Sequence, residues 1–317
     1  MTLIYIAQLL LPVALVLWMT MAPPRSRLGW GVQLAATLLV LWAMAHIGIW
    51  LFPPWWTPHA AAALVVAAAL WAWRRSAPRT EWPKGIAGWG AALLFGTAGA
   101  AGAFYGARAS AGAQPPDVRD APVVALAWPL HGGTFMVVNG GNDLTINSHR
   151  ESLVAPAPRL LPWRGNAWAV DLVAIDGFGL RATGFMPTDP ARYRVFGVPV
   201  LAPCSGQVVQ AVGDLADMAV PEIDRHHLAG NHVILACDGA HIVMAHFRHG
   251  SLRVVASDAV HVGQRLADVG NSGGSNEPHL HIHAQRPGPP GAPMGGQPLP
   301  ITFDGRFLVR GERIELP

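Results

Sequence analysis

The N-terminal third of the sequence has almost no acidic residues. Residues 1–107 contain a single acidic side chain, Glu81, whereas residues 108–317 hold 16 basic and 18 acidic side chains. The six basic residues of the first segment are Arg25, Arg27, Arg74, Arg75, Arg79 and Lys84. The net charge of +3 therefore originates in the first third. The larger C-terminal part lacks the clustered Lys and Arg of a nucleic-acid-binding domain, which argues against a nucleic-acid partner.

Charged side chains are absent from four long apolar runs in this first third. The runs span residues 2–21, 29–52, 55–73 and 85–107. Each is long enough to cross a hydrocarbon core of about 30 Å, the third only if Trp55 and Trp56 lie in the interfacial aromatic belt. Four such runs in succession favour four transmembrane helices over a buried water-soluble bundle. In the fourth, Gly102 and Gly106 have the GxxxG spacing that permits close helix packing.

Basic residues in the connections predict the orientation of these helices. Arg25 and Arg27 lie in the first connection, and four more basic residues lie in the third, 74–84. The positive-inside rule places both connections in the cytoplasm. An even number of crossings then predicts a multi-pass membrane protein whose C-terminal domain lies outside the cytoplasm. A cleaved signal peptide fits the first run less well, because no basic segment precedes it.

Cysteine is scarce, and the spacing of the two cysteines matches no zinc-ribbon pattern. Cys204 and Cys237 both lie in or beside apolar runs that resemble strands of one sheet. In an oxidising compartment they would pair, and the closed loop would stabilise the fold by roughly 3–4 kcal/mol. Two unpaired buried thiols are the alternative.

Long amphipathic helical patterns are missing from the second half. Residues 108–122 are rich in small residues and Pro, and we expect them to form a linker. From 123 to 317, short runs of Val, Ile, Leu and Phe alternate with Gly, Pro, Asn and Asp. This pattern predicts an all-β, mainly antiparallel domain. The expected organisation is therefore a four-helix transmembrane domain at 1–107, the linker, and an extracytoplasmic β domain at 123–317.

Histidine recurs at every second position in the run "HLHIH". If this run is a strand, His279, His281 and His283 share one face, whereas Leu280 and Ile282 share the other. Such a row of imidazoles is a metal site, an acid–base site or a coincidence of surface composition. A hydrolytic zinc site needs about three protein ligands and an open position for water.

Further candidate ligands come from other segments: His149 in "INSHR", Asp171 in "WAVDLV" and His246 in "VMAHF". Asp171 lies between Val170 and Leu172, and an unpaired carboxylate in a half-buried strand costs free energy. A metal, an arginine or a set of backbone N–H donors would each compensate for that cost. An isolated histidine such as His246 is more often a satisfied polar group than a ligand.

Four sequence blocks carry a resemblance to a known family. They read "APCSGQVV", "GNHVIL", "AHFRHGSLRV" and "VGQRLADVGNSGGSNEPHLHIHA", in this order. In order and spacing they resemble the lysostaphin-type zinc metallopeptidases, the family that includes LytM-domain murein hydrolases. The resemblance extends over roughly 123–316 and is densest at 197–284. It implies a small antiparallel β domain with one Zn²⁺ ion in a groove, and a substrate among the stem peptides or cross-links of peptidoglycan. Together with the predicted topology, it implies a protein of the bacterial inner membrane whose C-terminal domain is periplasmic.

The resemblance also assigns roles to individual residues. His281, the second histidine of the HxH pair, is implied as a zinc ligand, and His279 as a catalytic histidine. Asp171 corresponds to the ligand aspartate that leads into an apolar strand. His246 corresponds to the other catalytic histidine.

One part of the family pattern is broken. The first ligand usually lies four residues before the aspartate, where this chain has Ala167. Some relatives instead carry an N-x-H block upstream, and "INSHR" resembles that block, so we expect His149 to be the first ligand. His131 in "PLHGG" is the alternative. If neither residue serves, the domain binds no metal.

This ligand set predicts a hydrolytic mechanism. Two imidazoles and one carboxylate leave zinc a net positive charge and an open position, which acidifies water and polarises a carbonyl. The sequence contains no HExxH, so His246 and His279 are the candidates for proton transfer and oxyanion stabilisation. We expect His283 to be exposed at the groove edge. The remaining histidines of this domain that we expect in loops or on the surface are His226, His227, His232, His241, His249 and His261.

Two other functions remain open. Family members that have lost ligands act as binding or regulatory modules, and the broken HxxxD allows this here. The apolar runs also allow a membrane sensor, in which the C-terminal domain recognises a ligand. Transport is not indicated, because the runs contain no Asp, Glu, Lys or Arg. The expected partners are a peptide or peptidoglycan substrate and the lipid bilayer, with no nucleic acid. The sequence predicts no oligomeric state.

Overall fold

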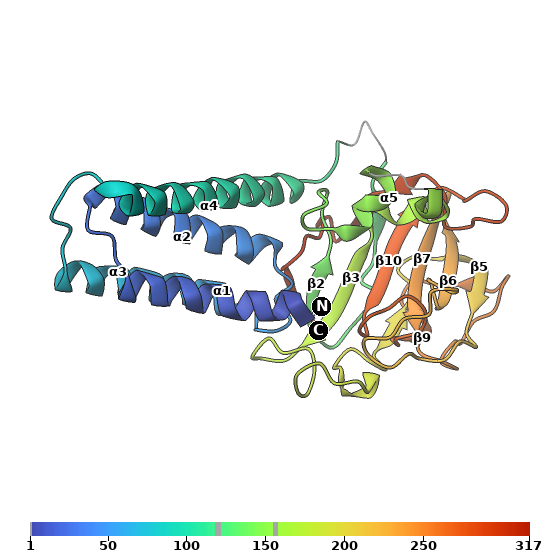
Figure 1. Ribbon diagram of the computed structural model, residues 1–317. Helices are drawn as coiled ribbons and strands as arrows, with labels where there is room; N and C mark the ends of the chain where they lie inside the picture. The colour runs from blue at the N-terminus through green and yellow to red at the C-terminus, as the bar shows by residue number, and fades with distance from the viewer. Residues whose placement is uncertain (1, 118–121, 155–157) are drawn as a thin grey trace. The chain divides into compact units, whose positions relative to one another are not determined.

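The computed structural model describes residues 2–117, 122–154 and 158–317. The chain divides into two compact units, Met1–Ala111 and Gly112–Pro317. The first contains helices alone and the second is built on a β-sheet (Figure 1). Each unit is described by itself below.

Four helices make up the first unit. They are α1 (Thr2–Met21), α2 (Arg27–Ile47), α3 (Thr57–Arg75) and α4 (Gly85–Gly112). Among the described residues, three helices are long and apolar enough to cross a membrane, and these are α1, α2 and α4. The expected fourth span is not confirmed, because α3 begins after Trp55 and Trp56 and ends with Arg74 and Arg75. The two arginines lower its mean hydropathy.

Small side chains let α3 pack against its neighbours within this unit. Ala68 of α3 packs with Met19 of α1, and Val65 of α3 packs with Leu41 of α2. The opposite face of α3 carries large apolar side chains, and Leu64 on that face is exposed. The two faces of α3 therefore differ in the size of their side chains rather than in their polarity.

Glycines bring α4 close to α2. A Cβ atom at Gly102 would lie 2.9 Å from the backbone of Leu39, closer than Cβ atoms pack in proteins. A Cβ atom at Gly106 would overlap the ring of Trp42. The prediction that the GxxxG pair serves close helix packing is confirmed.

Helix α4 continues past the expected domain boundary at 107. It ends at Gly112, inside the segment 108–122 that we expected to be a linker. Alanine favours a helix, and Pro115 is the first proline after the start of α4 that would interrupt one. Residues 118–121 of the expected linker lie outside the described residues.

The second unit is built on one antiparallel sheet, in which nine strands are described (Figure 1). Their order is β13-β2-β3-β10-β7-β6-β5-β8, with β11 paired to β10. The strands are β13 (Arg313–Leu316), β2 (Gly133–Asn139), β3 (Val170–Ile175), β10 (Leu280–Gln285), β7 (Ala240–Phe247), β6 (Asn231–Cys237), β5 (Gly206–Val212), β8 (Ala259–Val260) and β11 (Pro298–Leu299). The expectation of a mainly antiparallel β domain is confirmed.

Short elements flank this sheet. A parallel pair joins β1 (Val124–Leu126) to β12 (Ile301–Phe303), and an antiparallel pair joins β4 (Pro199–Leu201) to β9 (Arg265–Asp268). The helical elements of the unit are η1 (Ser148–Arg150), α5 (Glu151–Val154), η2 (Pro158–Trp168) and η3 (Pro190–Arg192).

A tight turn joins β6 to β7. Its centre is Asp238 and Gly239, with φ angles of 47° and 76°, and Cys237 pairs with Ala240 across it. Positive φ at both central residues is the type I′ geometry, whose twist matches that of the flanking strands. An Asp-Gly pair adopts this geometry readily, which fixes the register of the hairpin.

The two faces of the sheet bury different kinds of residue. On β10, Leu280 and Ile282 belong to the main apolar core. His281 and His283 alternate with them and lie on the opposite face, where their rings are hydrogen-bonded to each other. The period-2 prediction for the histidine row is confirmed on this strand. The candidate site residues of β10 therefore lie on the face of the sheet that points away from the main core.

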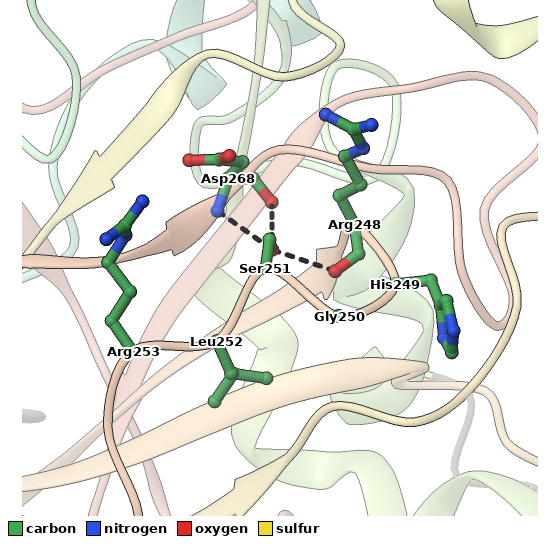
Figure 2. A pocket seen from close by; sticks show the side chains of 7 residues that line it. All are labelled: Arg248, His249, Gly250, Ser251, Leu252, Arg253 and Asp268. Carbon is green, nitrogen blue, oxygen red and sulfur yellow. Dashed lines mark hydrogen bonds between the residues drawn. The ribbon is translucent and has the colours of Figure 1, made fainter.

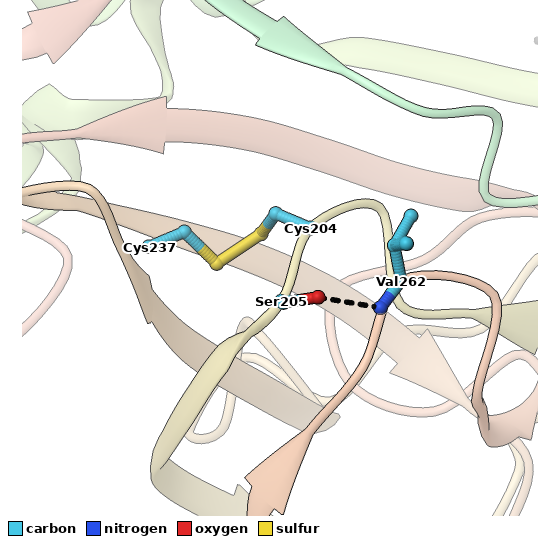
Figure 3. The surroundings of a disulfide bond; sticks show 4 residues. All are labelled: Cys204, Ser205, Cys237 and Val262. Atoms are coloured by element: carbon cyan, nitrogen blue, oxygen red, sulfur yellow. Dashed lines mark hydrogen bonds between the residues drawn. A yellow bond between two sulfur atoms is a disulfide. The ribbon is translucent and has the colours of Figure 1, made fainter.

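A disulfide joins Cys204 to Cys237 (Figure 3). Cys204 lies in the connection between β4 and β5, and Cys237 is the last residue of β6. Beside the bond, the hydroxyl of Ser205 accepts a hydrogen bond from Val262 N at 3.0 Å. The connection between β4 and β5 is therefore held in place by a disulfide to β6 and by a hydrogen bond from Val262. Of the two sequence-based alternatives, the structure has the paired cysteines.

Candidate functional site

Three segments bring the expected ligands to one point. Asp171 on β3 lies directly opposite His281 on β10, and His281 Nδ1 lies 2.9 Å from Asp171 Oδ1. His149, on η1, places its Nε2 atom 3.6 Å from Asp171 Oδ2. Donor atoms of the three residues all lie within 4.8 Å of one another. The arrangement offers two imidazole nitrogens and one carboxylate to a single cation.

The two expected catalytic histidines lie beside this point. The ring centroids of His246 and His279 are 4.8 Å apart. Together with His281 they form a second group whose donor atoms lie within 4.8 Å of one another. His279 Nε2 also lies 3.7 Å from Asp171 Oδ1. All five residues singled out from the sequence are thus brought together by the fold.

Carbonyl oxygens determine which ring nitrogen carries the hydrogen in three of these imidazoles. The three bonds are His246 Nδ1 to Ser272 O at 2.9 Å, His279 Nδ1 to Glu277 O at 2.8 Å, and His149 Nδ1 to Asn147 Oδ1 at 3.0 Å. Because a carbonyl oxygen only accepts, each Nδ1 atom carries the hydrogen and each Nε2 atom keeps its lone pair. The site therefore presents three nitrogen lone pairs suited to metal ligation or to proton acceptance.

A β-bulge turns His246 toward the site. On β6, Asn231 pairs with Phe247 and His232 pairs with Ala245, so His246 is an extra residue without a partner on that strand. Its φ angle is 66°, a region that non-glycine residues rarely adopt. Strict alternation along β7 would have pointed this ring into the main core. Bulges commonly re-aim a side chain next to an active site, and this bulge brings the His246 ring beside His279.

Neighbouring imidazoles keep Asp171 ionised despite its burial. Burial alone would raise the pKa of this carboxyl, which is 4% exposed. His149, His279 and the hydrogen bond from His281 outweigh burial and hold the pKa well below its ordinary value. The Asn139 side-chain amide adds a hydrogen bond to Oδ2 at 2.8 Å.

Burial has the opposite consequence for His149 and His246, because it lowers their pKa values and favours the neutral ring. It lowers the pKa of His149 from 6.5 to about 4, although Asp171 raises that pKa. Burial also lowers the pKa of His246 well below its ordinary value. A neutral imidazole is the form that binds a metal or accepts a proton, so these side chains are in the required state at neutral pH.

The donor set fits a divalent zinc ion. Two imidazoles and one carboxylate are the protein ligands of many hydrolytic zinc sites. Three groups could offset the cost of burying the Asp171 carboxylate, according to the sequence: a metal, an arginine or backbone N–H donors. Among the described residues, the close contacts of the Asp171 carboxylate are the histidines and Asn139, and the buried Arg310 guanidinium interacts with it electrostatically. A bound cation would add a positive charge in direct contact with the carboxylate.

Two expectations about histidine exposure are wrong. His283 was expected to be exposed but is 2% exposed, because β10 is a central strand between β3 and β7 and all of its residues are buried. Its Nδ1 atom lies 2.9 Å from His281 Nε2, so it orients that ring. His232 and His241 lie on strands β6 and β7, the first buried and the second half-buried, rather than in loops.

The remaining histidines of the β unit are exposed. His131, the alternative first ligand, is exposed and precedes β2. Asn139, at the opposite end of β2, is the residue that pairs with Asp171, so His131 is roughly 20 Å along the strand from the site. The histidines that are exposed as expected are His226, His227, His249 and His261.

The polar residues that support the site were not predicted. Asn147 orients His149, and Asn139 holds Asp171 while accepting a hydrogen bond from Arg310 Nη2 at 2.7 Å. Asn147 was within reach of sequence analysis, since it is the first residue of the N-x-H block. Asn139 and Arg310 come from strands and loops that only the folded sheet brings together, so no local pattern marks them.

A pocket of about 300 Å³ opens beside the histidines. His149, His246 and His281 line one part of it, and apolar side chains including Trp163 and Met294 line another. Such a mixture suits a peptide whose backbone meets the polar part and whose side chains meet the apolar part.

A second pocket, of about 430 Å³, contains none of the predicted site residues. It is formed by residues 248–253 and Asp268 (Figure 2). At its centre Ser251 Oγ donates to Arg248 O at 2.8 Å and accepts from Asp268 N at 3.1 Å. These bonds stabilise the turn after β7. Because the candidate ligands and catalytic histidines lie elsewhere, we place the chemistry in the histidine-lined pocket.

Residues 193–293 match the model of peptidase family M23. The match confirms the lysostaphin-type resemblance and contains His246, His279 and His281. His149 and Asp171 precede the matched M23 region, so their roles rest on geometry and on the sequence resemblance.

Solved structures similar to parts of this chain include three bacterial proteins. One is a mutant catalytic domain of the prophage-encoded M23 protein EnpA from Enterococcus faecalis, with 22% identity, 39% of this chain and 71% of that chain covered, and a TM-score of 0.26. The antimicrobial peptidase lysostaphin from Staphylococcus simulans has 21% identity, 41% and 39% coverage, and a TM-score of 0.25. A zinc-containing peptidase from Vibrio cholerae has 18% identity, 37% and 46% coverage, and a TM-score of 0.23. The chain thus spans less than half of the last two structures, and no curated protein matches it.

Proposed function

We propose that this chain is a membrane-embedded zinc metallopeptidase that hydrolyses peptide bonds in peptidoglycan. The M23 match supports a peptidase, and that family is zinc-dependent. The observation that carries the proposal is the convergence of His149, Asp171 and His281 from three separate segments, with donor atoms within 4.8 Å of one another. Membrane insertion is supported by the three helices that are long and apolar enough to span a bilayer.

His149, Asp171 and His281 would hold the zinc ion. When bound, zinc polarises the carbonyl of the scissile peptide and lowers the pKa of water toward about 7. Asn147 and His283 keep the two imidazoles in place by bonding their other ring nitrogens, and such support raises the precision of a metal site.

His246 and His279 would move the proton. Each has its Nδ1 hydrogen held by a backbone carbonyl and its Nε2 lone pair free. One of these Nε2 atoms accepts a proton from the attacking water, and the proton then passes to the nitrogen of the leaving amine. The other ring stabilises the charge that develops on the carbonyl oxygen when its Nε2 atom is protonated, because that N–H then donates a hydrogen bond to the oxygen. Because the carbonyl contacts on Nδ1 persist throughout, neither ring needs to turn.

The side of the membrane follows from the number of crossings. If α1, α2 and α4 cross alone, the four basic residues at the end of α3 and between α3 and α4 lie outside the cytoplasm, and the disulfide-containing unit lies inside. Both placements conflict with the positive-inside rule and with the oxidising compartments where disulfides persist. A fourth crossing by α3 removes both conflicts. Its exposed apolar face, with Leu64 at 59% exposure, suits contact with lipid.

Fusion of alkaline phosphatase to the C-terminus tests this topology. The enzyme is active only outside the cytoplasm, so four crossings give an active fusion. Three crossings give an inactive one, and that result would contradict the periplasmic placement of the β unit.

Metal analysis of the full chain in detergent tests the chemistry. We expect about one zinc ion per chain, and His281→Ala should abolish binding because it removes a ligand. His246→Ala should retain zinc but lose hydrolysis of purified peptidoglycan. His261→Ala, at an exposed position, is the matched control and should change neither. A folded chain that binds no zinc and cleaves no peptidoglycan would instead support a binding or regulatory module.

A further inference from the structure

An ion pair is buried next to the site in a place that the mechanism above does not use. Arg181 Nε lies 2.5 Å from Glu277 Oε2, and Arg181 Nη2 lies 2.7 Å from Glu277 Oε1. The two side chains are 3% and 8% exposed. Arg181 follows β3, whereas Glu277 immediately precedes the HxH strand, so the pair joins segments 96 residues apart in sequence.

Stability alone is a weak explanation for such a pair. Moving two charges out of water costs most of what their attraction gains, so a buried ion pair adds little net stability. What a two-point contact does supply is geometry, since the planar guanidinium holds both carboxylate oxygens in one orientation.

Glu277 supports His279 through its backbone. Its carbonyl oxygen accepts hydrogen bonds from His279 Nδ1 at 2.8 Å and from Ser275 Oγ at 2.7 Å. Pro278, between Glu277 and His279, has a fixed φ angle. Any rotation of Glu277 would therefore move the carbonyl that sets the tautomer and direction of the His279 ring.

Arg181 is itself fixed on the other side of the pair. Its carbonyl oxygen accepts a hydrogen bond from Arg194 N at 2.9 Å, and its guanidinium lies 5.6 Å from the centre of the Tyr193 ring. Tyr193 belongs to a small apolar cluster with Ala182 and Val220. The segment between β3 and β4 thus provides a rigid anchor for the turn that carries His279.

We propose that Arg181 and Glu277 are positioning residues for His279: the pair holds the Glu277 carbonyl so that His279 keeps its hydrogen on Nδ1 and points Nε2 into the site. This inference rests on the proposed function, in which His279 Nε2 handles a proton. Its structural part, the fixed tautomer, is measurable without any catalysis.

The test replaces the pair as a unit. Arg181→Met combined with Glu277→Leu removes both charges and keeps the volume apolar, a change that commonly preserves folding. Nitrogen-15 NMR of the histidine rings, recorded on the full metal-free chain in detergent, reports which nitrogen carries the hydrogen. His279→Gln identifies the signals of His279.

In the wild-type chain we expect the His279 hydrogen on Nδ1, and in the double variant a mixture of both tautomers. Zinc content should stay at the wild-type level, because none of the three ligands is touched. For peptidoglycan hydrolysis, kcat should fall about 10- to 100-fold with KM nearly unchanged, the size of effect that a displaced catalytic group produces. Arg181→Lys alone, with Glu277 intact, keeps the charge of the pair, and its kcat should fall less than that of the double variant.

Arg194→Met is the matched control. Arg194 lies in the same segment and pairs with Asp176 at 2.6 Å, but it does not bond Glu277 through its side chain. It should leave the His279 tautomer and kcat at wild-type values. Should the double variant fail to fold, Glu277→Gln, which keeps the shape of the side chain, decides by the same two measurements.

The outcomes separate the two proposals. A wild-type His279 tautomer together with wild-type kcat in the folded variant overturns the positioning role. If the wild-type chain itself cleaves no peptidoglycan, the proposed function fails, and the NMR comparison still decides whether the ion pair sets the tautomer.

Discussion

The two units of this chain place their large apolar side chains on opposite sides. In the helical unit many of them face outward, as Leu93 does at 74% exposure, and small residues such as Ala68 are buried between helices. In the β unit large side chains such as Phe135 and Phe247 form the core. The helical unit thus gains little from burying apolar surface and relies on close packing, whereas the β unit relies on its core and a disulfide. Each unit should therefore fail by its own kind of mutation.

Loss of the disulfide should give the largest effect, confined to the β unit. The bond between Cys204 and Cys237 closes a loop of 33 residues in sequence separation, so Cys204→Ala with Cys237→Ala should lower the free energy of unfolding by about 3–4 kcal/mol. Hydrogen exchange measured by mass spectrometry reports each unit separately. Peptides of the helical unit should exchange at the wild-type rate.

Reduction provides the control for this prediction. A reductant should destabilise the wild-type β unit by a similar amount and leave the double alanine variant unchanged. Equal exchange in wild-type and variant chains would show that the bond contributes nothing to stability.

Acid should destabilise the metal-free β unit next in size. The pKa of His149 falls from 6.5 to about 4 on burial, so the unfolded chain takes up the proton at a higher pH than the folded one. The stability of this unit is then highest above pH 6.5 and falls between pH 6.5 and 4 by roughly 3 kcal/mol for this residue. Burial shifts the pKa values of His246 and His283 in the same direction.

Hydrogen exchange of the chelated chain at pH 7 and pH 4.5, corrected for the intrinsic exchange rate, measures this loss. His149→Gln should make the pH dependence shallower, because one of the titrating groups is removed. The helical unit should show no comparable dependence, and equal acid sensitivity of the two units would contradict the comparison.

Local patterns were sufficient for the strands and for part of the site. Alternation in "HLHIH" placed His281 away from the core, and the apolar neighbours of Asp171 marked its strand. The same alternation made His283 equivalent to His281, but its burial depends on β10 lying between two other strands, which no single segment reveals. The position of His246 depends on a bulge, and an insertion in a strand pair is invisible until the register of both strands is known.

The membrane helices show a different limit. Length and apolar composition identified α1, α2 and α4, and the Gly102–Gly106 spacing predicted the close approach to α2. The ends of α3 were misplaced, since the apolar run from Trp55 to Trp73 does not coincide with the helix. Composition detects a span well, but the limits of a helix depend on capping and on contacts with neighbours.

Filling the helix contact should cost less than the changes in the β unit. At Gly102 a Cβ atom would lie 2.9 Å from the Leu39 backbone, whereas at Gly90 nothing lies within 4 Å. Gly102→Leu should therefore destabilise the helical unit by about 1–3 kcal/mol through overpacking. Gly90→Leu, on the same helix, should be neutral or slightly stabilising. Thermal unfolding in nanodiscs compares them, and equal melting temperatures would refute the close contact.

The smallest effect should come from a buried amide in the helical unit. Gln33 is 1% exposed and its side-chain nitrogen and oxygen have no hydrogen-bond partner among the described residues. Gln8, 4% exposed, instead bonds the N–H and the carbonyl oxygen of Ile49. Gln33→Leu should raise the free energy of unfolding by about 1 kcal/mol, because an unpaired polar group leaves the interior. Gln8→Leu should lower it, because two backbone groups lose their partner. A destabilising Gln33→Leu would mean that water or a polar ligand satisfies the amide inside the bundle, and that this unit, like the β unit, depends on buried polar contacts.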